Sequence, residues 1–154
     1  MKQIESILVA TDFSECSQLA LRAACELGSK LGATVDVVHV WEMPAFVAPD
    51  LVVASAGTDT ETLLAHTRAR ADLAIGNLLK EAEGAGLKLH HGRAEQGDPS
   101  ETVVRLAEEG GYGLVVVGTH GRTGLARLFL GSVAEKIVRA SRTPVLIIRA
   151  EGGG

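Results

Sequence analysis

Residues 114–133, LVVVGTHGRTGLARLFLGSV, combine an apolar run, a glycine-rich loop and the start of a helix. Leu114–Val117 is continuously apolar, as expected for a strand buried on both faces of a parallel sheet. Glycine then recurs at every third position from 118 to 124, and residues without Cβ let a ligand approach the backbone closely. Ser132 precedes a periodic run to about residue 140, and we expect it to cap that helix. Because the free amides of a first helical turn bind phosphate, the segment predicts an anion site.

Positive charge gathers in the same part of the chain. The whole chain has a net charge of −4, yet the segment 118–149 holds six basic residues and one acidic residue. A bound phosphate would explain this surplus, and a solvated helix face would explain part of it. The basic residues are Arg122, Arg127, Lys136, Arg139, Arg142 and Arg149, and the acidic residue is Glu135.

The glycine pattern is not one of the common phosphate-binding motifs. It contains neither Gly-Lys-Ser/Thr nor Gly-x-Gly-x-x-Gly. Glycine content alone therefore leaves two interpretations open, a phosphate-binding loop and a plain strand-to-helix connection.

Hydrophobic periodicity predicts a regular alternation of strands and helices. We expect strands at residues 4–10, 34–41, 87–95, 114–117 and 144–149, and helices at 15–31, 58–83, 99–109 and 132–140. This order predicts a single α/β domain, at residues 1–150, with an open, mainly parallel five-stranded sheet and helices on both faces, flavodoxin-like or Rossmann-like. Ligands bind such sheets beyond the carboxyl ends of the strands. If the first and fourth strands are neighbours, Asp12 and Gly118 border one crevice.

Two segments fall outside this alternation. Residues 42–57 contain two prolines, several apolar side chains and no regular period. They fit a lid over the ligand, a dimer contact or a simple insertion, and the sequence does not choose among these. Residues 151–154 are expected to form a disordered tail.

Composition narrows the function classes. A pI near 5.7 gives no overall attraction to nucleic acid or anionic membranes, and only 3% of the residues are aromatic. No apolar run reaches the roughly 18 residues of a membrane span, and the N-terminus does not resemble a signal peptide, so we expect a cytoplasmic protein. Cys16 and Cys25 are expected to be reduced and to pack as small apolar residues.

The spacing of the glycines resembles a family signature. Gly118-x-x-Gly121, nine residues and then Gly131-Ser132 are similar to the ATP-binding pattern Gly-2x-Gly-9x-Gly-Ser/Thr of the universal stress protein family. The stretches ILVATDFSE and TPVLIIR also resemble the first and last strands of that family, so the resemblance covers almost the whole chain.

The resemblance implies an adenine nucleotide site for ATP with Mg²⁺, and a homodimer. The first strand would contribute nucleotide contacts from Ala10, Thr11 and Asp12, and the second strand would bind adenine through the backbone of Val40. Ribose and phosphates would lie against the glycine signature. Dimers would pair through the fifth strand at Val145, Leu146, Ile147 and Ile148. The signature residues carried over are Gly118, Thr119, Gly121, Arg122, Gly131, Ser132 and Val133.

Each polar candidate also has a structural interpretation. Asp12 suits ribose hydroxyls or a Mg²⁺ ion held through water, and it equally suits a helix cap. Arg122 suits a phosphate clamp or solvated surface. A lone His120 beside glycine favours a structural or exposed position over a general base, and His90 and His91 would point to opposite faces of a strand.

Two functions of different classes follow. The first is an ATP-binding, homodimeric stress-response protein in which the nucleotide is a regulatory or structural ligand, with at most slow hydrolysis and no assigned catalytic residue. The second is a nucleotide-independent interaction module that acts through its dimer edge and the 42–57 segment.

Overall fold

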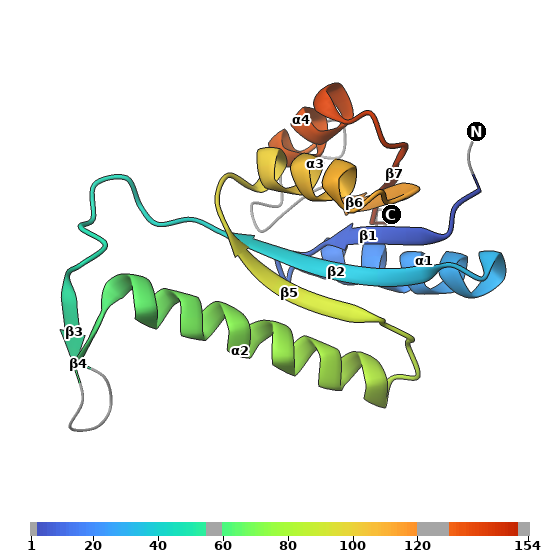
Figure 1. Ribbon diagram of the computed structural model, residues 1–154. Helices are drawn as coiled ribbons and strands as arrows, with labels where there is room; N and C mark the ends of the chain where they lie inside the picture. The colour runs from blue at the N-terminus through green and yellow to red at the C-terminus, as the bar shows by residue number, and fades with distance from the viewer. Residues whose placement is uncertain (1–2, 55–59, 120–129, 151–154) are drawn as a thin grey trace.

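The central feature of the computed structural model is a five-stranded sheet, which lies at the middle of the molecule (Figure 1). The structure describes residues 3–54, 60–119 and 130–150. The strand order is β5-β2-β1-β6-β7, and every pair of neighbours is parallel. The strands are β1 (Ser6–Ala10), β2 (Thr34–Trp41), β5 (His91–Gln96), β6 (Leu114–Gly118) and β7 (Val145–Ile148).

The predicted fold class is confirmed, and the strand order is of the Rossmann type. The first and fourth strands of the sheet, β1 and β6, are direct neighbours in the register Ile7 to Leu114. The chain therefore reverses its direction of travel across the sheet between β1 and β6, and this is where such folds bind ligands.

Helices cover both faces of the sheet. The helices α1 (Glu15–Leu31) and α2 (Leu63–Gly84) pack on one face, and α3 (Pro99–Glu109) and α4 (Ser132–Ala140) pack on the other. Figure 1 shows α3 and α4 above the sheet and α2 below it. Both cysteines are free and buried in α1, as expected.

Strand β1 supplies side chains to both cores. Ile7 and Val9 belong to the α1/α2 core and Leu8 to the α3/α4 core, and all three are at most 1% exposed. Full burial of such a side chain contributes about 1.5–3 kcal/mol. The predicted two-sided burial is also confirmed for β6, since Leu114 to Val117 are all buried.

The segment between β2 and α2 differs from the prediction. A short antiparallel hairpin forms there, from β3 (Val52–Ala54) and β4 (Thr60–Thr62), and it projects away from the main sheet (Figure 1). The expected helix start at residue 58 is wrong, because α2 begins only at Leu63. Residues 55–57 of the 42–57 segment lie outside the described residues.

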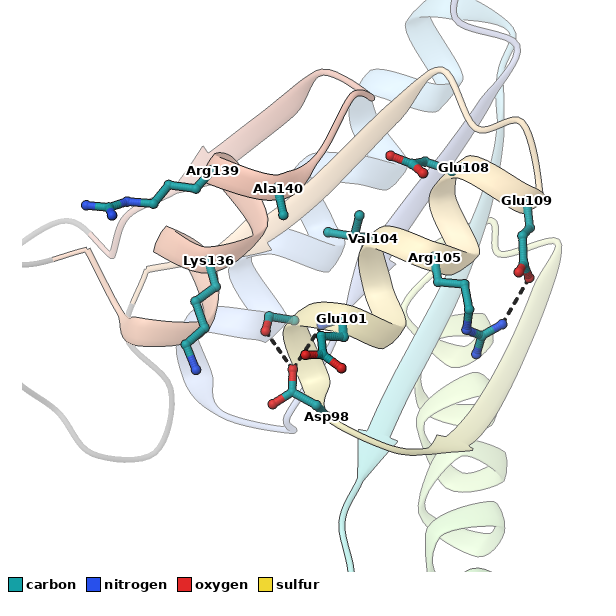
Figure 2. A pocket seen from close by; sticks show the side chains of 10 residues that line it. Asp98, Glu101, Val104, Arg105, Glu108, Glu109, Lys136, Arg139 and Ala140 are labelled. Carbon is teal, nitrogen blue, oxygen red and sulfur yellow. Dashed lines mark hydrogen bonds and ion pairs between the residues drawn. The ribbon is translucent and has the colours of Figure 1, made fainter.

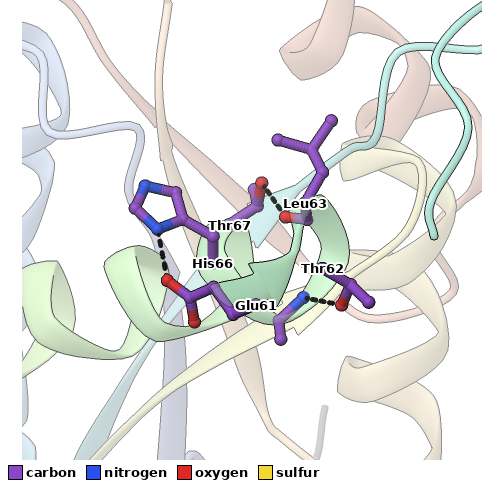
Figure 3. A network of polar contacts seen from close by, with 6 residues as sticks. Glu61, Thr62, Leu63, His66 and Thr67 are labelled. Atoms are coloured by element: carbon purple, nitrogen blue, oxygen red, sulfur yellow. Dashed lines mark hydrogen bonds and ion pairs between the residues drawn. The ribbon is translucent and has the colours of Figure 1, made fainter. Parts of the chain in front are cut away.

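Side chains at the junction fix the start of α2 (Figure 3). The Thr62 hydroxyl accepts a hydrogen bond from the Ala65 amide at 3.2 Å and caps the helix. His66 Nδ1 donates to Glu61 Oε1 at 2.6 Å, which ties the helix to β4. Together these contacts place the helix start after the hairpin.

The edge strands of the sheet are β5 and β7. Strand β5 begins at His91, four residues later than expected, because its pairing with β2 begins only at Asp36 and His91. No described helix is long and apolar enough to span a membrane. The predicted tail, residues 151–154, lies outside the described residues.

Candidate functional site

The predicted site lies where β1, β2 and β6 end. The Thr11 amide donates to the Val38 carbonyl at 2.9 Å, and the Thr119 amide donates to the Ile148 carbonyl at 3.0 Å. These bonds extend the sheet by one residue beyond β1 and β6. Both threonine side chains are buried, with exposures of 5% and 1%. The two chain segments therefore leave the sheet from fixed positions.

The turn after β1 is closed by its own hydroxyl groups. Thr11 Oγ1 accepts from the Phe13 amide at 3.0 Å and lies 3.1 Å from Ser17 Oγ. Ser14 caps α1 by accepting from the Ser17 amide at 3.2 Å. Asp12 is therefore not the helix cap; its Oδ1 accepts from the Ser14 amide at 2.9 Å.

Asp12 is held in its ionised form. Burial on its own would raise the pKa of this carboxyl, but the hydrogen bonds from Ser14 and Ser17 outweigh burial and lower the pKa below its ordinary value. A charged carboxylate at the carboxyl end of β1 suits hydroxyl groups or a hydrated cation.

Gly118 allows α1 and β6 to approach closely. A Cβ atom at Gly118 would lie 3.0 Å from the backbone C and O atoms of Cys16 and from its Sγ. The Cys16 thiol also donates to the Ile148 carbonyl at 3.5 Å. A side chain at position 118 would push the start of α1, and with it the turn that carries Asp12, away from β6.

The start of α4 corrects one prediction. The N-cap is Gly131, with extended backbone, and Ser132 is the first helical residue, exposed to solvent. Ser132 is therefore not the cap, because its own backbone is already helical. The N-cap Gly131 has no side chain, whereas Ser14, Thr62 and Asp98 cap the other helices through theirs. Among the described residues, no side chain accepts a hydrogen bond from the first-turn amides of α4.

Gly131 joins this helix to the end of β6. Its amide donates to the Thr119 carbonyl at 2.6 Å, and its carbonyl accepts from the Glu135 amide at 2.9 Å. The uncapped end of α4 and the carboxyl end of β6 are therefore directly connected.

The remaining predicted residues are placed as follows. Val40 is the second-last residue of β2, and the register of Ala10 with Val38 places it level with Asp12. Val133 is in the first turn of α4 and 41% exposed. The structure thus brings together all of the described candidates at one edge of the sheet. Gly121, Arg122 and His120 lie outside the described residues.

Two residues at this edge were not predicted as part of the site. His39 Nδ1 donates to the Thr11 carbonyl at 2.9 Å, and its ring lies against Phe13, with 4.5 Å between ring centroids. Phe13 has a positive φ of 63°. The sequence shows His39 only as one of two charged or titratable side chains in a valine-rich strand, the other being Asp36, and this does not reveal a contact with the turn after β1.

Two pockets lie away from the predicted residues. One, of about 600 Å³, lies between α3 and α4 and has Val104 in its floor and charged side chains at its walls (Figure 2). The other, of about 330 Å³, lies between α1 and α2. Lys136 and Arg139, counted in the basic surplus, line the first pocket, and Arg139 pairs with Glu135 at 2.7 Å. Part of that surplus therefore belongs to a solvated helix surface.

The described residues offer a metal ion only isolated side-chain ligands. Within residues 3–54, 60–119 and 130–150 no cluster of three or more metal-binding side chains occurs. A cation at Asp12 would therefore depend on water and on its ligand for the remaining coordination.

Known proteins resemble this chain in sequence over most of its length. Universal stress protein MJ0531 of Methanocaldococcus jannaschii is 31% identical over 145 residues, which cover 94% of this chain and 82% of the relative. Universal stress protein YxiE of Bacillus subtilis is 30% identical, over 93% of this chain and 97% of the relative.

Solved structures agree with these sequence similarities. The structure of MJ0577 from the same archaeon superposes with a TM-score of 0.73 at 25% identity, over 99% of this chain and 100% of that one. A universal stress protein in complex with cAMP superposes with a TM-score of 0.68 at 24% identity, over 96% and 98% of the two chains, and shares the fold. The family's sequence pattern matches residues 3–149. The chain therefore belongs to the universal stress protein family.

Proposed function

We propose that this chain is an ATP-binding, nucleotide-regulated homodimer of the stress response. One observation carries the proposal: α4 begins without a side-chain cap, and its first turn is tied through Gly131 to the end of β6. A helix start of this kind offers free amides and a positive dipole end to an anion. The complete glycine signature lies on the same segment.

Different residues of the site would bind the phosphates, the ribose and the adenine of the nucleotide. Phosphates would be bound by the amides of Ser132 and Val133 and by the glycine loop. The ribose hydroxyls would donate to the Asp12 carboxylate, which is ionised at neutral pH. The adenine would lie against the backbone of Val40, level with Asp12 at the end of β2.

A Mg²⁺ ion would lie between the phosphates and Asp12, held through water. The ion would supply charge neutralisation to the triphosphate. We assign no catalytic residue and expect ATP turnover to be slow. The relative solved with cAMP supports an adenine nucleotide as the ligand class.

The dimer would form along β7. This strand is at the edge of the sheet, so its outer backbone groups have no partner strand, and Leu146 is 36% exposed. An unpaired apolar edge favours pairing with a second strand. Val145, Leu146, Ile147 and Ile148 would then face their copies in a partner.

The dimer proposal is tested by sedimentation equilibrium of Leu146→Lys. Ile147 packs against the α3/α4 core, so the exposed Leu146 is the better position to change. We expect the mass to fall from dimer to monomer because a buried lysine would be unpaired. Leu73→Lys, at a 64% exposed position on α2, is the control and should keep the dimer mass. A dimer mass for Leu146→Lys would remove β7 from this role.

An interaction module is the second candidate function. The segment before β3 and the first residues of β3 expose Phe46, Leu51 and Val52, at 92%, 51% and 63%. Three large apolar side chains within seven residues favour a contact with another macromolecule. This function would not require nucleotide.

Nucleotide content and affinity distinguish the two functions. The protein is purified without added nucleotide, denatured, and any released adenine nucleotide is identified by chromatography. Stripped protein is then titrated with Mg²⁺ and ATP by calorimetry. We expect stoichiometric nucleotide or a saturable binding heat. Folded protein with neither result would refute nucleotide binding and leave the interaction module.

A further inference from the structure

The turn after β1 contains a strained residue. Phe13 has φ of 63°, in the left-handed region that side chains other than glycine rarely occupy. Such conformations cost about 1–3 kcal/mol and persist where surrounding contacts impose them. They occur often at ligand sites, and Phe13 directly follows Asp12.

His39 of the neighbouring strand β2 contacts the residues on both sides of Asp12. Its Nδ1 donates to the Thr11 carbonyl at 2.9 Å, so Nδ1 carries the ring proton. Its ring contacts the Phe13 ring, at a centroid distance of 4.5 Å and an interplanar angle of 50°. One side chain of β2 thus holds both residues that flank Asp12.

The hydrogen bonds within the turn do not replace this contact. The Phe13 and Ser14 amides bind Thr11 Oγ1 and Asp12 Oδ1, which fixes the turn relative to itself and to α1. The Thr11 amide already donates to the Val38 carbonyl of β2, and the His39 contact adds a second attachment, from a β2 side chain to the Thr11 carbonyl. The end of β2 is also where the adenine is proposed to bind.

We propose that His39 is a positioning residue for the nucleotide site, which it serves by fixing the Thr11–Asp12–Phe13 turn against β2. This inference rests on the proposed nucleotide function. Through its hydrogen bond to the Thr11 carbonyl, His39 would hold the turn that carries Asp12 against the end of β2, so that ribose and adenine contacts are available together. His39 acts through the turn and does not touch the nucleotide.

Three substitutions separate the two contacts of His39. In His39→Asn the side-chain amide nitrogen is attached as Nδ1 is in histidine, so the donor is retained and the ring is lost. In His39→Phe the ring is retained and the donor is lost. His39→Leu removes both. If His39 only packed in the core, His39→Phe would retain more of the nucleotide affinity than His39→Asn.

The test measures affinity for Mg²⁺ with ATP by calorimetry. We expect His39→Phe and His39→Leu to bind about tenfold more weakly, equivalent to about 1.4 kcal/mol, and His39→Asn to remain within about threefold of the unchanged protein. His90→Asn is the control, because His90 Nδ1 binds Asp36 at the opposite edge of the sheet. It should leave affinity unchanged. Equal affinity in His39→Phe and the unchanged protein would overturn the inference.

A second measurement needs no nucleotide. Amide hydrogen exchange at Phe13 and Ser14 should accelerate in His39→Phe, and it should stay slow in His39→Asn and His90→Asn. If the unchanged protein fails to bind nucleotide, the proposed function is wrong, and accelerated exchange would still show that His39 holds the turn. Unchanged exchange in His39→Phe would refute the positioning role itself.

Discussion

Polar groups are used in opposite ways where the parallel strands begin and where they end. These two borders are the amino edge and the carboxyl edge of the sheet. At the amino edge, Asp36 accepts hydrogen bonds from the Tyr112 hydroxyl at 2.5 Å and from His90 Nδ1 at 3.0 Å. These three residues come from three separate chain segments, and the carboxylate of Asp36 connects them. The amino edge is therefore closed by side chains that bind one another.

At the carboxyl edge, the side chains of the turn after β1 bind mainly within that turn, and His39 adds one contact from β2. Asp12, Thr11 and Ser14 bind backbone or side-chain groups within the same turn and the start of α1, and the first turn of α4 has no side-chain cap. Polar side chains alone therefore do not identify a binding site. A more informative signal is a set of backbone amides at a helix start that donate to no side chain among the described residues.

The largest predicted effect is the loss of nucleotide binding in Gly118→Val. The new side chain would collide with Cys16 and displace the turn that carries Asp12. We expect affinity to fall at least about 100-fold, equivalent to about 2.8 kcal/mol, because the ribose and phosphate contacts could no longer be made together. Calorimetry with Mg²⁺ and ATP measures it.

Gly28→Ala is the matched control at the other end of α1. A Cβ there would lie 2.6 Å from Val35 Cγ2 and 3.0 Å from the Ala33 carbonyl oxygen, near the amino edge. This variant should lose stability and keep its affinity. Comparable affinity losses in Gly118→Val and Gly28→Ala would show that the effect is a general loss of stability and not specific to the carboxyl edge.

An intermediate effect is expected for Tyr112→Phe at the amino edge. Removal of a hydroxyl that donates to a carboxylate should lower the free energy of unfolding by about 1.5 kcal/mol. Urea denaturation measures this change. Nucleotide affinity should not change, and a weaker affinity without a loss of stability would contradict the division between the two edges.

The contribution of the Tyr112 hydroxyl should also depend on pH. The pKa of Tyr112 is raised from 10.0 to about 12. Burial is the largest cause, and the hydrogen bond to Asp36 and the negative charge of Asp36 are the next two. Because the folded pKa is the higher one, the stabilisation is present below pH 10 and is lost as the pH rises through about 12. The stability difference between the unchanged protein and Tyr112→Phe should shrink in this window.

The smallest effect is expected for Asp12→Asn. The pKa of Asp12 is lowered in the folded protein, so its charge stabilises the fold above the ordinary value of 3.8. That contribution is lost as the pH falls through the lower, folded pKa. The stability difference between the two proteins, measured by urea denaturation, should therefore decrease in acid. A difference that grows in acid would mean that the charge of Asp12 opposes folding.

Much of the fold could be predicted because apolar runs and caps are local. Strand β2 matches its predicted bounds, and α3 begins at the predicted residue, Pro99, after the cap Asp98. The hairpin was not predicted, because strands of three residues such as Val52–Ala54 are too short to show a period. Its pairing depends on contacts with the start of α2.

Part of the candidate site could also be predicted, because it depends on local features of the sequence. Glycine spacing and the ends of strands are visible in the sequence, and they led to Asp12 and Gly118. The cap of α4 was assigned one residue late, because Ser132 and Gly131 are both acceptable cap residues and only the backbone distinguishes them. His39 was missed because its contacts with Thr11 and Phe13 cross between strands.

The most direct test of the central claim is to map the amide chemical shifts of the ¹⁵N-labelled protein as Mg²⁺ and ATP are added. Shifts are expected at Thr11–Phe13, Val40, Gly118–Thr119 and Gly131–Val133, with Asp36, His90 and Tyr112 unchanged. Shifts confined to the amino edge, or to the α3/α4 pocket, would contradict the assignment of the nucleotide to the carboxyl edge.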